Sequence, residues 1–145
     1  MQELPQERLI IANFAMGSAE ATLEQTVEYA KTRTAFGKSI SENQNTQFKL
    51  AEMDAEITAM RVFVDHCLQL YIDGALDTAT ASMAKLLSTE LQVRVIDECV
   101  QLHGGYGYMW EYPVARAYAD SRIQKIYGGT SEVMKIIITR ALLSQ

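Results

Sequence analysis

The sequence lacks several features that would place it in other classes of protein. It has only two prolines and two cysteines, so neither a proline-rich linker nor a disulfide framework fits it. No apolar run approaches the roughly 18 residues of a membrane-spanning helix, and residues 1–30 lack the layout of a signal peptide. The net charge of -5 comes without a basic cluster, which argues against a nucleic-acid or anionic-membrane surface. We therefore expect a soluble, unexported protein whose partners are small molecules or other proteins.

What is present is the composition of one well-packed domain. With 145 residues and 48% hydrophobic content, the chain can build one core and is short for a two-domain enzyme. Apolar residues recur at helical spacing in three segments, at about 6–32, across 50–71 and at about 77–103. We expect these three stripes to be buried, with both cysteines as buried thiols: Leu9, Ala12, Met16, Ala19, Leu23 and Ala30; Leu50, Met53, Ile57, Met60, Val64, Cys67 and Tyr71; Ala84, Leu87, Leu91, Val95, Cys99 and Leu102.

Turn chemistry separates the helical segments. Breaks are predicted at 36–45, 73–74 and 104–113, where glycine, asparagine, aspartate or proline occur. A fourth helix should cover about 113–126, and a fifth should run from Thr130 or Ser131, as its N-cap, to about 143. No alternating strand pattern competes. The sequence therefore predicts an all-α fold, an up-down helical bundle of four main helices plus a C-terminal helix.

Five short motifs occur in a fixed order along the chain. They are Arg-x-x-Phe-Gly at 33–37, a glutamine-rich helix start at 44–47, Gln-Leu-His-Gly-Gly-Tyr-Gly at 101–107, Glu-Tyr-Pro at 111–113 and Ile-Tyr-Gly-Gly-Thr at 126–130. Together they resemble the C-terminal helical domain of the acyl-CoA dehydrogenases, from Leu4 to about Leu143, and the wording is most similar to the long-chain type. The resemblance implies a flavin-dependent oxidation of a fatty acyl-CoA to a trans-2-enoyl-CoA.

The catalytic base is where this chain departs from many members of that family. Many carry a glutamate directly after the tyrosine of the last motif, and this sequence has Gly128 there. In the long-chain and isovaleryl types the base is a glutamate near the start of the domain's first helix, a position that Glu7 matches. An acid in a first helical turn, after Pro5, is also an ordinary helix-start feature. The resemblance implies that Glu7 removes the α-proton of the thioester.

The resemblance also implies a substrate site around this base. Pro5, Gln6 and Arg8 match the segment that lines it, and Arg8 either supports the loop or lies near the CoA moiety. The backbone N–H of Gly128 resembles half of the site that polarises the thioester carbonyl, and glycine keeps this donor while freeing space. Gly128 and Gly129 are therefore both expected in the substrate site, and a flexible turn formed by these two glycines before the last helix is the simpler alternative.

The flavin, FAD, is expected to contact four further segments, at Arg33, at Gln44, at 101–105 and at 130–132. Arg33 matches an arginine that reaches the flavin diphosphate of a neighbouring subunit, although a solvated helix-end cation would look the same. The turn at 101–105 is expected against the adenosine portion, and otherwise is a glycine C-cap. The resemblance also assigns Thr130, Ser131 and Glu132 to flavin contact, and capping of the last helix explains the Thr130 hydroxyl equally well. The candidate cofactor residues are Arg33, Gln44, Gln101, Leu102, His103, Gly104, Gly105, Thr130, Ser131 and Glu132.

Two further groups receive no catalytic role. Neither His66 nor His103 has a partner at a catalytic or metal-ligand spacing, so we expect no acid–base histidine and no metal site. An aromatic cluster between helices is interpreted as packing or interface; it comprises Tyr106, Tyr108, Met109, Trp110 and Tyr112.

The resemblance places this chain third among three units, after an N-terminal helical domain and a middle β-domain that the 145 residues do not contain. Without them we expect no tight flavin binding and no turnover. Expected partners are an acyl-CoA substrate, an electron-transfer flavoprotein as acceptor and further copies in a homotetramer, located in the cytoplasm if bacterial or the mitochondrial matrix if eukaryotic. Two alternatives stay open: a non-catalytic helical oligomerisation module, and an acyl-CoA oxidase that uses dioxygen.

Overall fold

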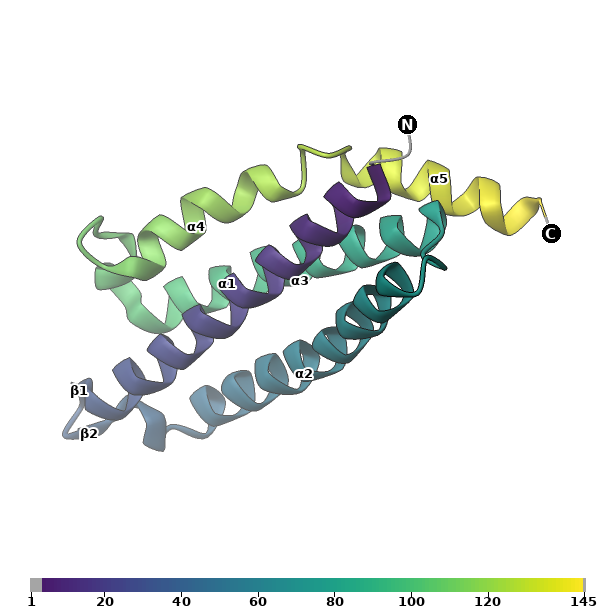
Figure 1. Ribbon diagram of the computed structural model, residues 1–145. Helices are drawn as coiled ribbons and strands as arrows, with labels where there is room; N and C mark the ends of the chain where they lie inside the picture. Colours follow the sequence, from purple (N-terminus) through teal and green to yellow (C-terminus); the bar gives the residue numbers. More distant parts are fainter. Residues whose placement is uncertain (1–3, 145) are drawn as a thin grey trace.

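The computed structural model describes residues 4–144 and forms a bundle of five α-helices. They are α1 (Leu4–Thr32), α2 (Gln44–Ile72), α3 (Thr78–His103), α4 (Pro113–Gln124) and α5 (Ser131–Leu143). The first four run alternately up and down, and α5 continues past the end of the bundle (Figure 1). This confirms the predicted all-α, up-down architecture, with helix ends within about two residues of those predicted, the usual uncertainty of such boundaries.

Helix α3 occupies the centre, because it packs against α1, α2, α4 and α5. Its first turn is capped by Asp77, whose carboxylate accepts hydrogen bonds from the N–H groups of Ala79 (2.8 Å) and Thr80 (2.9 Å). Its last turn ends at Gly104, which has a positive φ of 61°. Both ends of the central helix are thus fixed by local chemistry that the sequence displays.

The core follows the predicted stripes, although Leu50, Met60 and Leu102 are only partly buried and two further stripe residues are exposed. All six stripe residues of α1 are buried, and both cysteine thiols are buried as predicted. Tyr71 and Leu87, however, are 41% and 46% exposed, so their predicted burial is wrong. Tyr71 lies in the last turn of α2, and Leu87 lines an open groove between α2 and α3. Helical periodicity identifies a face but not the points at which a neighbouring helix leaves that face uncovered.

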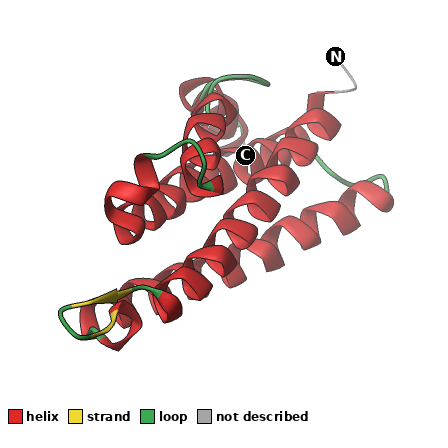
Figure 2. Ribbon diagram, turned by 90° about the vertical axis from the view of Figure 1, so that its left-hand side faces the viewer, coloured by secondary structure: helices red, strands yellow, loops and turns green. Residues whose placement is uncertain are grey.

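A short antiparallel hairpin, which the sequence analysis did not predict, joins α1 to α2. Strand β1 (Thr34–Ala35) pairs with β2 (Lys38–Ser39), seen in yellow in Figure 2. The turn residues Phe36 and Gly37 have φ angles of 53° and 83°, as a two-residue hairpin with matching twist requires. Strands of two residues are too short to show alternation in the sequence, which explains why periodicity missed them. Two 3-10 helices, η1 (Ile40–Glu42) and η2 (Gly104–Tyr108), occupy parts of the predicted breaks at 36–45 and 104–113.

Candidate active site

The turn between α4 and α5 contains two glycines with left-handed backbone angles, φ 66° at Gly128 and 108° at Gly129. The carbonyl oxygen of Gly128 accepts a long hydrogen bond from Nε of Arg8 (3.5 Å). The carbonyl oxygen of Gly129 accepts one from Nζ of Lys85 (2.7 Å). Cations from α1 and α3 therefore hold consecutive carbonyls of a segment that its two glycines alone would leave flexible. We call this segment, Gly128 and Gly129, the diglycine turn.

Both cations are withdrawn from solvent. Arg8 is 4% exposed and Lys85 is fully buried. Burial lowers the pKa of both side chains; the Glu7 carboxylate partly offsets this for Arg8, and Glu90 does so for Lys85. Arg8 also donates to Oγ of Ser82 (3.3 Å). Because burying a charge costs several kcal/mol unless it is well hydrogen-bonded, these contacts to the diglycine turn are needed for the cations to be tolerated.

Lys85 is the residue that sequence reasoning missed. A lysine between apolar stripe positions is normally interpreted as pointing to solvent. The available signal is that Lys85 shares a helical face with Ala81 and Ser88, four residues before and three after it, and both are buried. Small residues on both sides of a lysine on the most enclosed helix indicate that its side chain lies inside.

Glu7, the predicted base, lies in the first turn of α1 with an exposed side chain. It shares a helical face with Ile11, one turn further along. The Cδ1 atom of Ile11 lies 2.5 Å from the point where a Cβ at position 128 would be. The face of α1 that carries Glu7 is therefore the face that meets the diglycine turn. The same contact shows that the space expected to be free beside Gly128 is filled by Ile11.

The N–H of Gly128 is available as a donor. Within residues 4–144 it donates to no carbonyl or side-chain acceptor, whereas the preceding N–H, of Tyr127, donates to the carbonyl of Ile123 (3.2 Å). The hydroxyl groups of the two residues after the turn, unlike the N–H of Gly128, have hydrogen-bond partners within the chain. Thr130 is the N-cap of α5, since its hydroxyl accepts from the N–H of Val133 (3.4 Å), and the hydroxyl of Ser131 donates to Glu90 (2.6 Å). Glu132 is exposed in the first turn of α5.

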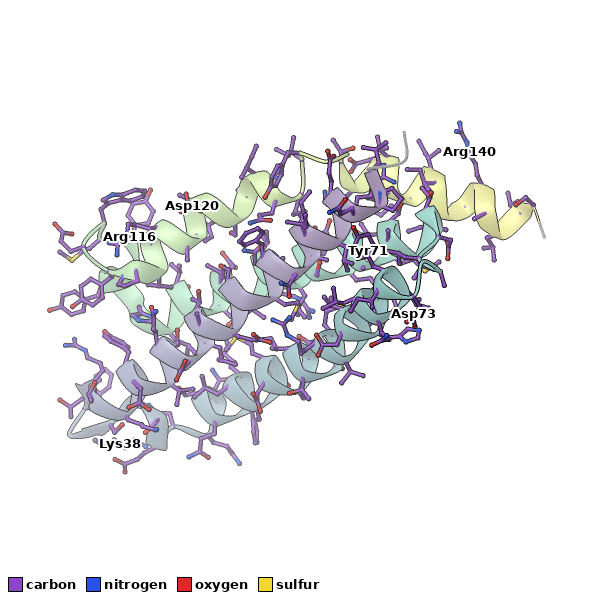
Figure 3. The ribbon with its side chains drawn as sticks, viewed as in Figure 1. Lys38, Tyr71, Asp73, Arg116, Asp120 and Arg140 are labelled. Atoms are coloured by element: carbon purple, nitrogen blue, oxygen red, sulfur yellow. The ribbon has the colours of Figure 1, made fainter. Side chains whose placement is uncertain are left out.

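The predicted substrate segment divides over two faces of α1. Arg8 points to the diglycine turn, whereas Gln6 lines a groove of about 150 Å³ together with Leu68 and Tyr71 of α2. Figure 3 labels Tyr71 at this end of the bundle. Pro5 is half-buried at the helix start. Of the four residues from Pro5 to Arg8, only Arg8 contacts the diglycine turn directly, and Glu7 shares the helical face of Ile11, which also contacts it.

The predicted flavin-contacting residues of the other segments meet at the opposite end of the bundle. Arg33 and all five residues of the 101–105 turn line one groove of about 540 Å³. The guanidinium of Arg33 lies over the ring of Tyr106, 5.2 Å from its centre. Gln44 is not among the residues that line this groove; it is the exposed first residue of α2. The structure therefore brings the Arg33 and 101–105 segments together in one groove and places Gln44, which was predicted to contact the same cofactor, outside it.

His103 is a packing residue in this groove wall. Its ring stacks on Tyr29 with centres 4.1 Å apart, and its Nδ1 lies 2.8 Å from the carbonyl oxygen of Cys99, which can only accept. Burial lowers the pKa of His103, which favours the neutral ring. The aromatic cluster divides: Tyr106 packs on Tyr112, with ring centres 5.1 Å apart, whereas Tyr108 and Trp110 are exposed. Packing within the chain therefore accounts for part of the cluster, and the interface interpretation of its exposed members stays a prediction.

The two groups of residues are far apart. Glu7 and Arg33 are 26 positions apart on or just beyond the continuous helix α1, which corresponds to about 39 Å at the rise of an α-helix. Figure 1 shows the hairpin after α1 at one end of the bundle and the connection from α4 to α5 at the other. Residues 4–144 contain no group of three or more histidine, cysteine, aspartate or glutamate side chains that could hold a metal ion. None of their helices is both long enough and apolar enough to cross a membrane.

Comparison with known proteins agrees with this geometry. The family model described as "Acyl-CoA dehydrogenase, C-terminal domain" matches residues 1–143. The chain belongs to the acyl-CoA dehydrogenase family. The mitochondrial long-chain specific acyl-CoA dehydrogenase of Mus musculus is 56% identical over 144 residues, which cover 99% of this chain and 34% of that protein. This relative supports the long-chain type that the motif wording indicates.

Two solved acyl-CoA dehydrogenase structures share the fold. The crystal structure of the enzyme from Geobacillus kaustophilus superposes with a TM-score of 0.96 at 49% identity, over 98% of this chain and 37% of that one. A glutaryl-CoA dehydrogenase from Mycobacterium smegmatis, in complex with FADH2, superposes with a TM-score of 0.93 at 30% identity, over 98% and 37%. The chain thus spans about a third of the length of these relatives. It corresponds to their C-terminal helical domain.

Proposed function

We propose that this chain is the catalytic C-terminal domain of an FAD-dependent acyl-CoA dehydrogenase that oxidises a fatty acyl-CoA to a trans-2-enoyl-CoA, with Glu7 as the base. The supporting observation is the meeting of the start of α1 with the diglycine turn. Arg8 contacts the carbonyl of Gly128, and Ile11 fills the space beside it. Glu7 lies one helical turn before Ile11 on the same face, which supports a carboxylate that reaches the turn, whose own position 128 has no side chain.

The residues of the site suit proton abstraction next to a thioester. The carboxylate of Glu7 accepts the α-proton while the N–H of Gly128 donates to the thioester oxygen, on which negative charge develops. Glu7 is exposed in this chain, and a bound acyl chain would cover it and exclude water from the proton transfer. FAD, when bound, supplies the acceptor for the β-hydride.

The groove lined by Arg33 and the 101–105 turn fits the diphosphate and adenosine portion of FAD. Arg33 forms no ion pair with a carboxylate within residues 4–144, so its planar guanidinium can bind a diphosphate in bidentate fashion. A Cβ at Gly104 or Gly105 would meet no atom within 4 Å, so the turn presents an open surface to a ligand. Since this groove is about 39 Å along α1 from Glu7, we assign it to the FAD of a neighbouring subunit in a homotetramer.

The base is tested in the full-length, FAD-loaded protein by mixing it anaerobically with a panel of acyl-CoA substrates and following the bleaching of the flavin. Glu7→Gln should slow bleaching by about 10²- to 10⁴-fold, the usual contribution of a positioned base. The matched control is Glu24→Gln, which changes an exposed glutamate on the same helix. Bleaching at the wild-type rate in Glu7→Gln would remove Glu7 as the base.

The same assay separates the alternatives. A non-catalytic module would show no bleaching with any acyl-CoA. An oxidase would be reoxidised rapidly by air, whereas a dehydrogenase should need an electron-transfer flavoprotein as acceptor. We propose the dehydrogenase because the motif wording and the relative from Mus musculus both indicate the long-chain dehydrogenase type.

A further inference from the structure

The buried ammonium group of Lys85 is not explained by the base or by the flavin groove. Among residues 4–144, Lys85 is the largest side chain with less than 2% exposure. No carboxylate of these residues forms an ion pair with it, because the nearby Glu90 pairs with Lys125 (2.5 Å) and accepts from Ser131 (2.6 Å). The ammonium donates one hydrogen bond, to the carbonyl oxygen of Gly129. An apolar side chain of similar length would fill the same space without the cost of burying a charge.

The hydrogen bond from Lys85 to Gly129 matters because it holds the end of the diglycine turn. Glycine has no Cβ, so the backbone of the diglycine turn is not restricted by its own side chains. Upstream, the turn is anchored to α4 by the bond from the N–H of Tyr127 to Ile123 (3.2 Å). Downstream, it is anchored by Arg8 on the first glycine and Lys85 on the second. The N–H of Gly128 lies between these anchors, so its direction depends on both.

The Arg8 contact alone is weak. At 3.5 Å it is at the limit of a hydrogen bond, whereas the Lys85 contact at 2.7 Å is short and charge-assisted. Lys85 is also fully buried on the central helix, so its ammonium has little freedom to follow a shifted carbonyl. The stronger and more rigid of the two anchors is therefore Lys85.

We propose that Lys85 is a positioning residue for the dehydrogenation: by holding the Gly129 carbonyl it fixes the diglycine turn so that the N–H of Gly128 points at the thioester oxygen. This inference rests on the proposed function of the turn. Lys85 does not touch the substrate; it acts through the backbone. Its loss should slow the loss of the α-proton at saturating substrate more than it weakens substrate binding, because ground-state contacts elsewhere in the substrate are kept.

The test uses the full-length, FAD-loaded protein with Lys85→Met, and two readouts. The first is the rate of flavin bleaching at saturating acyl-CoA. The second is the long-wavelength charge-transfer absorbance with an analogue carrying sulfur in place of the β-methylene; this analogue can give its α-proton to Glu7 but transfers no hydride. We expect the bleaching rate per bound flavin to fall at least about tenfold, the charge-transfer band to weaken, and the dissociation constant of the analogue to change less than about threefold, since small misplacements of catalytic groups cost of this order.

The matched control is Lys49→Met, which removes a half-buried lysine that pairs with Glu98 elsewhere on the bundle. It should leave both readouts unchanged. If Lys85→Met lowers only the melting temperature, with bleaching and the charge-transfer band per bound flavin at wild-type values, Lys85 is purely structural and the inference is overturned. If Lys85→Met does not load FAD, Lys85→Arg decides: its bulkier fork must displace the carbonyl, so a wild-type rate in that variant also overturns the inference.

The failure of this inference is distinguishable from the failure of the proposed function. If wild-type protein shows the charge-transfer band and Glu7→Gln loses it, the base is supported whatever Lys85 does. If Glu7→Gln keeps the band, the proposed function fails even when Lys85→Met also slows bleaching.

Discussion

Replacing Gly128 by alanine should destabilise the fold by more than its backbone angle alone explains. Gly128 has φ 66°, a region that costs an L-residue about 1–2 kcal/mol. In addition, the new Cβ would lie 2.5 Å from Cδ1 of Ile11. That methyl group ends a buried side chain and can give way only by leaving its preferred rotamer or shifting its neighbours, which adds about 1 kcal/mol. We expect Gly128→Ala to cost about 2–3 kcal/mol in the free energy of unfolding.

Gly74→Ala provides a matched control for this prediction. Gly74 has nearly the same φ, 70°, but a Cβ there would meet nothing within 4 Å. It should therefore cost only the backbone part, about 1–2 kcal/mol. The entropy that alanine removes from the unfolded chain is common to both variants and cancels in the comparison. The difference of about 1 kcal/mol corresponds to roughly 0.5 M in the urea midpoint, followed by circular dichroism.

A double-mutant cycle assigns the difference to Ile11. Ile11→Val deletes the δ-methyl group and alone should cost about 0.5–1.5 kcal/mol. In the Gly128→Ala background the same change should cost about 1 kcal/mol less, because it also removes the clash. Equal midpoints for Gly128→Ala and Gly74→Ala, or strict additivity in the cycle, would refute the reasoning that Ile11 occupies the space beside position 128.

Three further predictions concern groups whose environment the structure fixes. Asp77→Ala should lower the free energy of unfolding by about 1 kcal/mol through loss of the α3 N-cap. Hydrogen bonds, first from the Thr80 hydroxyl, lower the pKa of Asp77 below its ordinary 3.8, so this stabilisation should be present above about pH 4 and disappear as the pH falls through the lowered pKa. Urea unfolding of both proteins at several pH values measures it. Burial lowers the pKa of His103 below its ordinary 6.5, so the unfolded chain binds a proton that the folded one resists, and the free energy of unfolding should fall as the pH drops below about 6.5. His103→Gln should flatten this dependence in urea titrations between about pH 5 and 7.5. Burial raises the pKa of Cys67 and raises that of Cys99 to about 11. Neither thiol should therefore react with a thiol reagent at about pH 8 until urea unfolds the chain. Rapid labelling of the native protein would contradict the burial of these two thiols in the core.

The helices could be predicted from the sequence because their signals are local. Asp77, Pro113 and Thr130 mark helix starts by capping chemistry, and the stripe on α1 is periodic and wholly buried. The hairpin at 34–39 was missed because two residues per strand give no alternation. Tyr71 was placed in the core because periodicity defines a face without showing where α2 is left uncovered.

The candidate site was predictable only where motifs carry it. The grouping of Arg33 with the 101–105 turn and the meeting of α1 with Gly128 followed from the resemblance and agree with the contacts. Lys85 could not be found this way, because a buried cation that binds a backbone carbonyl depends on a contact between residues 44 positions apart. Ile11 is similar, since its filling of space at position 128 is a tertiary contact between ordinary residues.

The length of α1 has a genetic consequence. A single helix of 29 residues carries the acid at one end and leads directly to the guanidinium at the other. On the proposed function, each subunit lends these two groups to different flavins. A mixed assembly of Glu7→Gln subunits and Arg33→Ala subunits would then contain some centres in which both groups are intact, so two inactive alleles expressed together should complement each other, whereas two alleles altered at the same end should not.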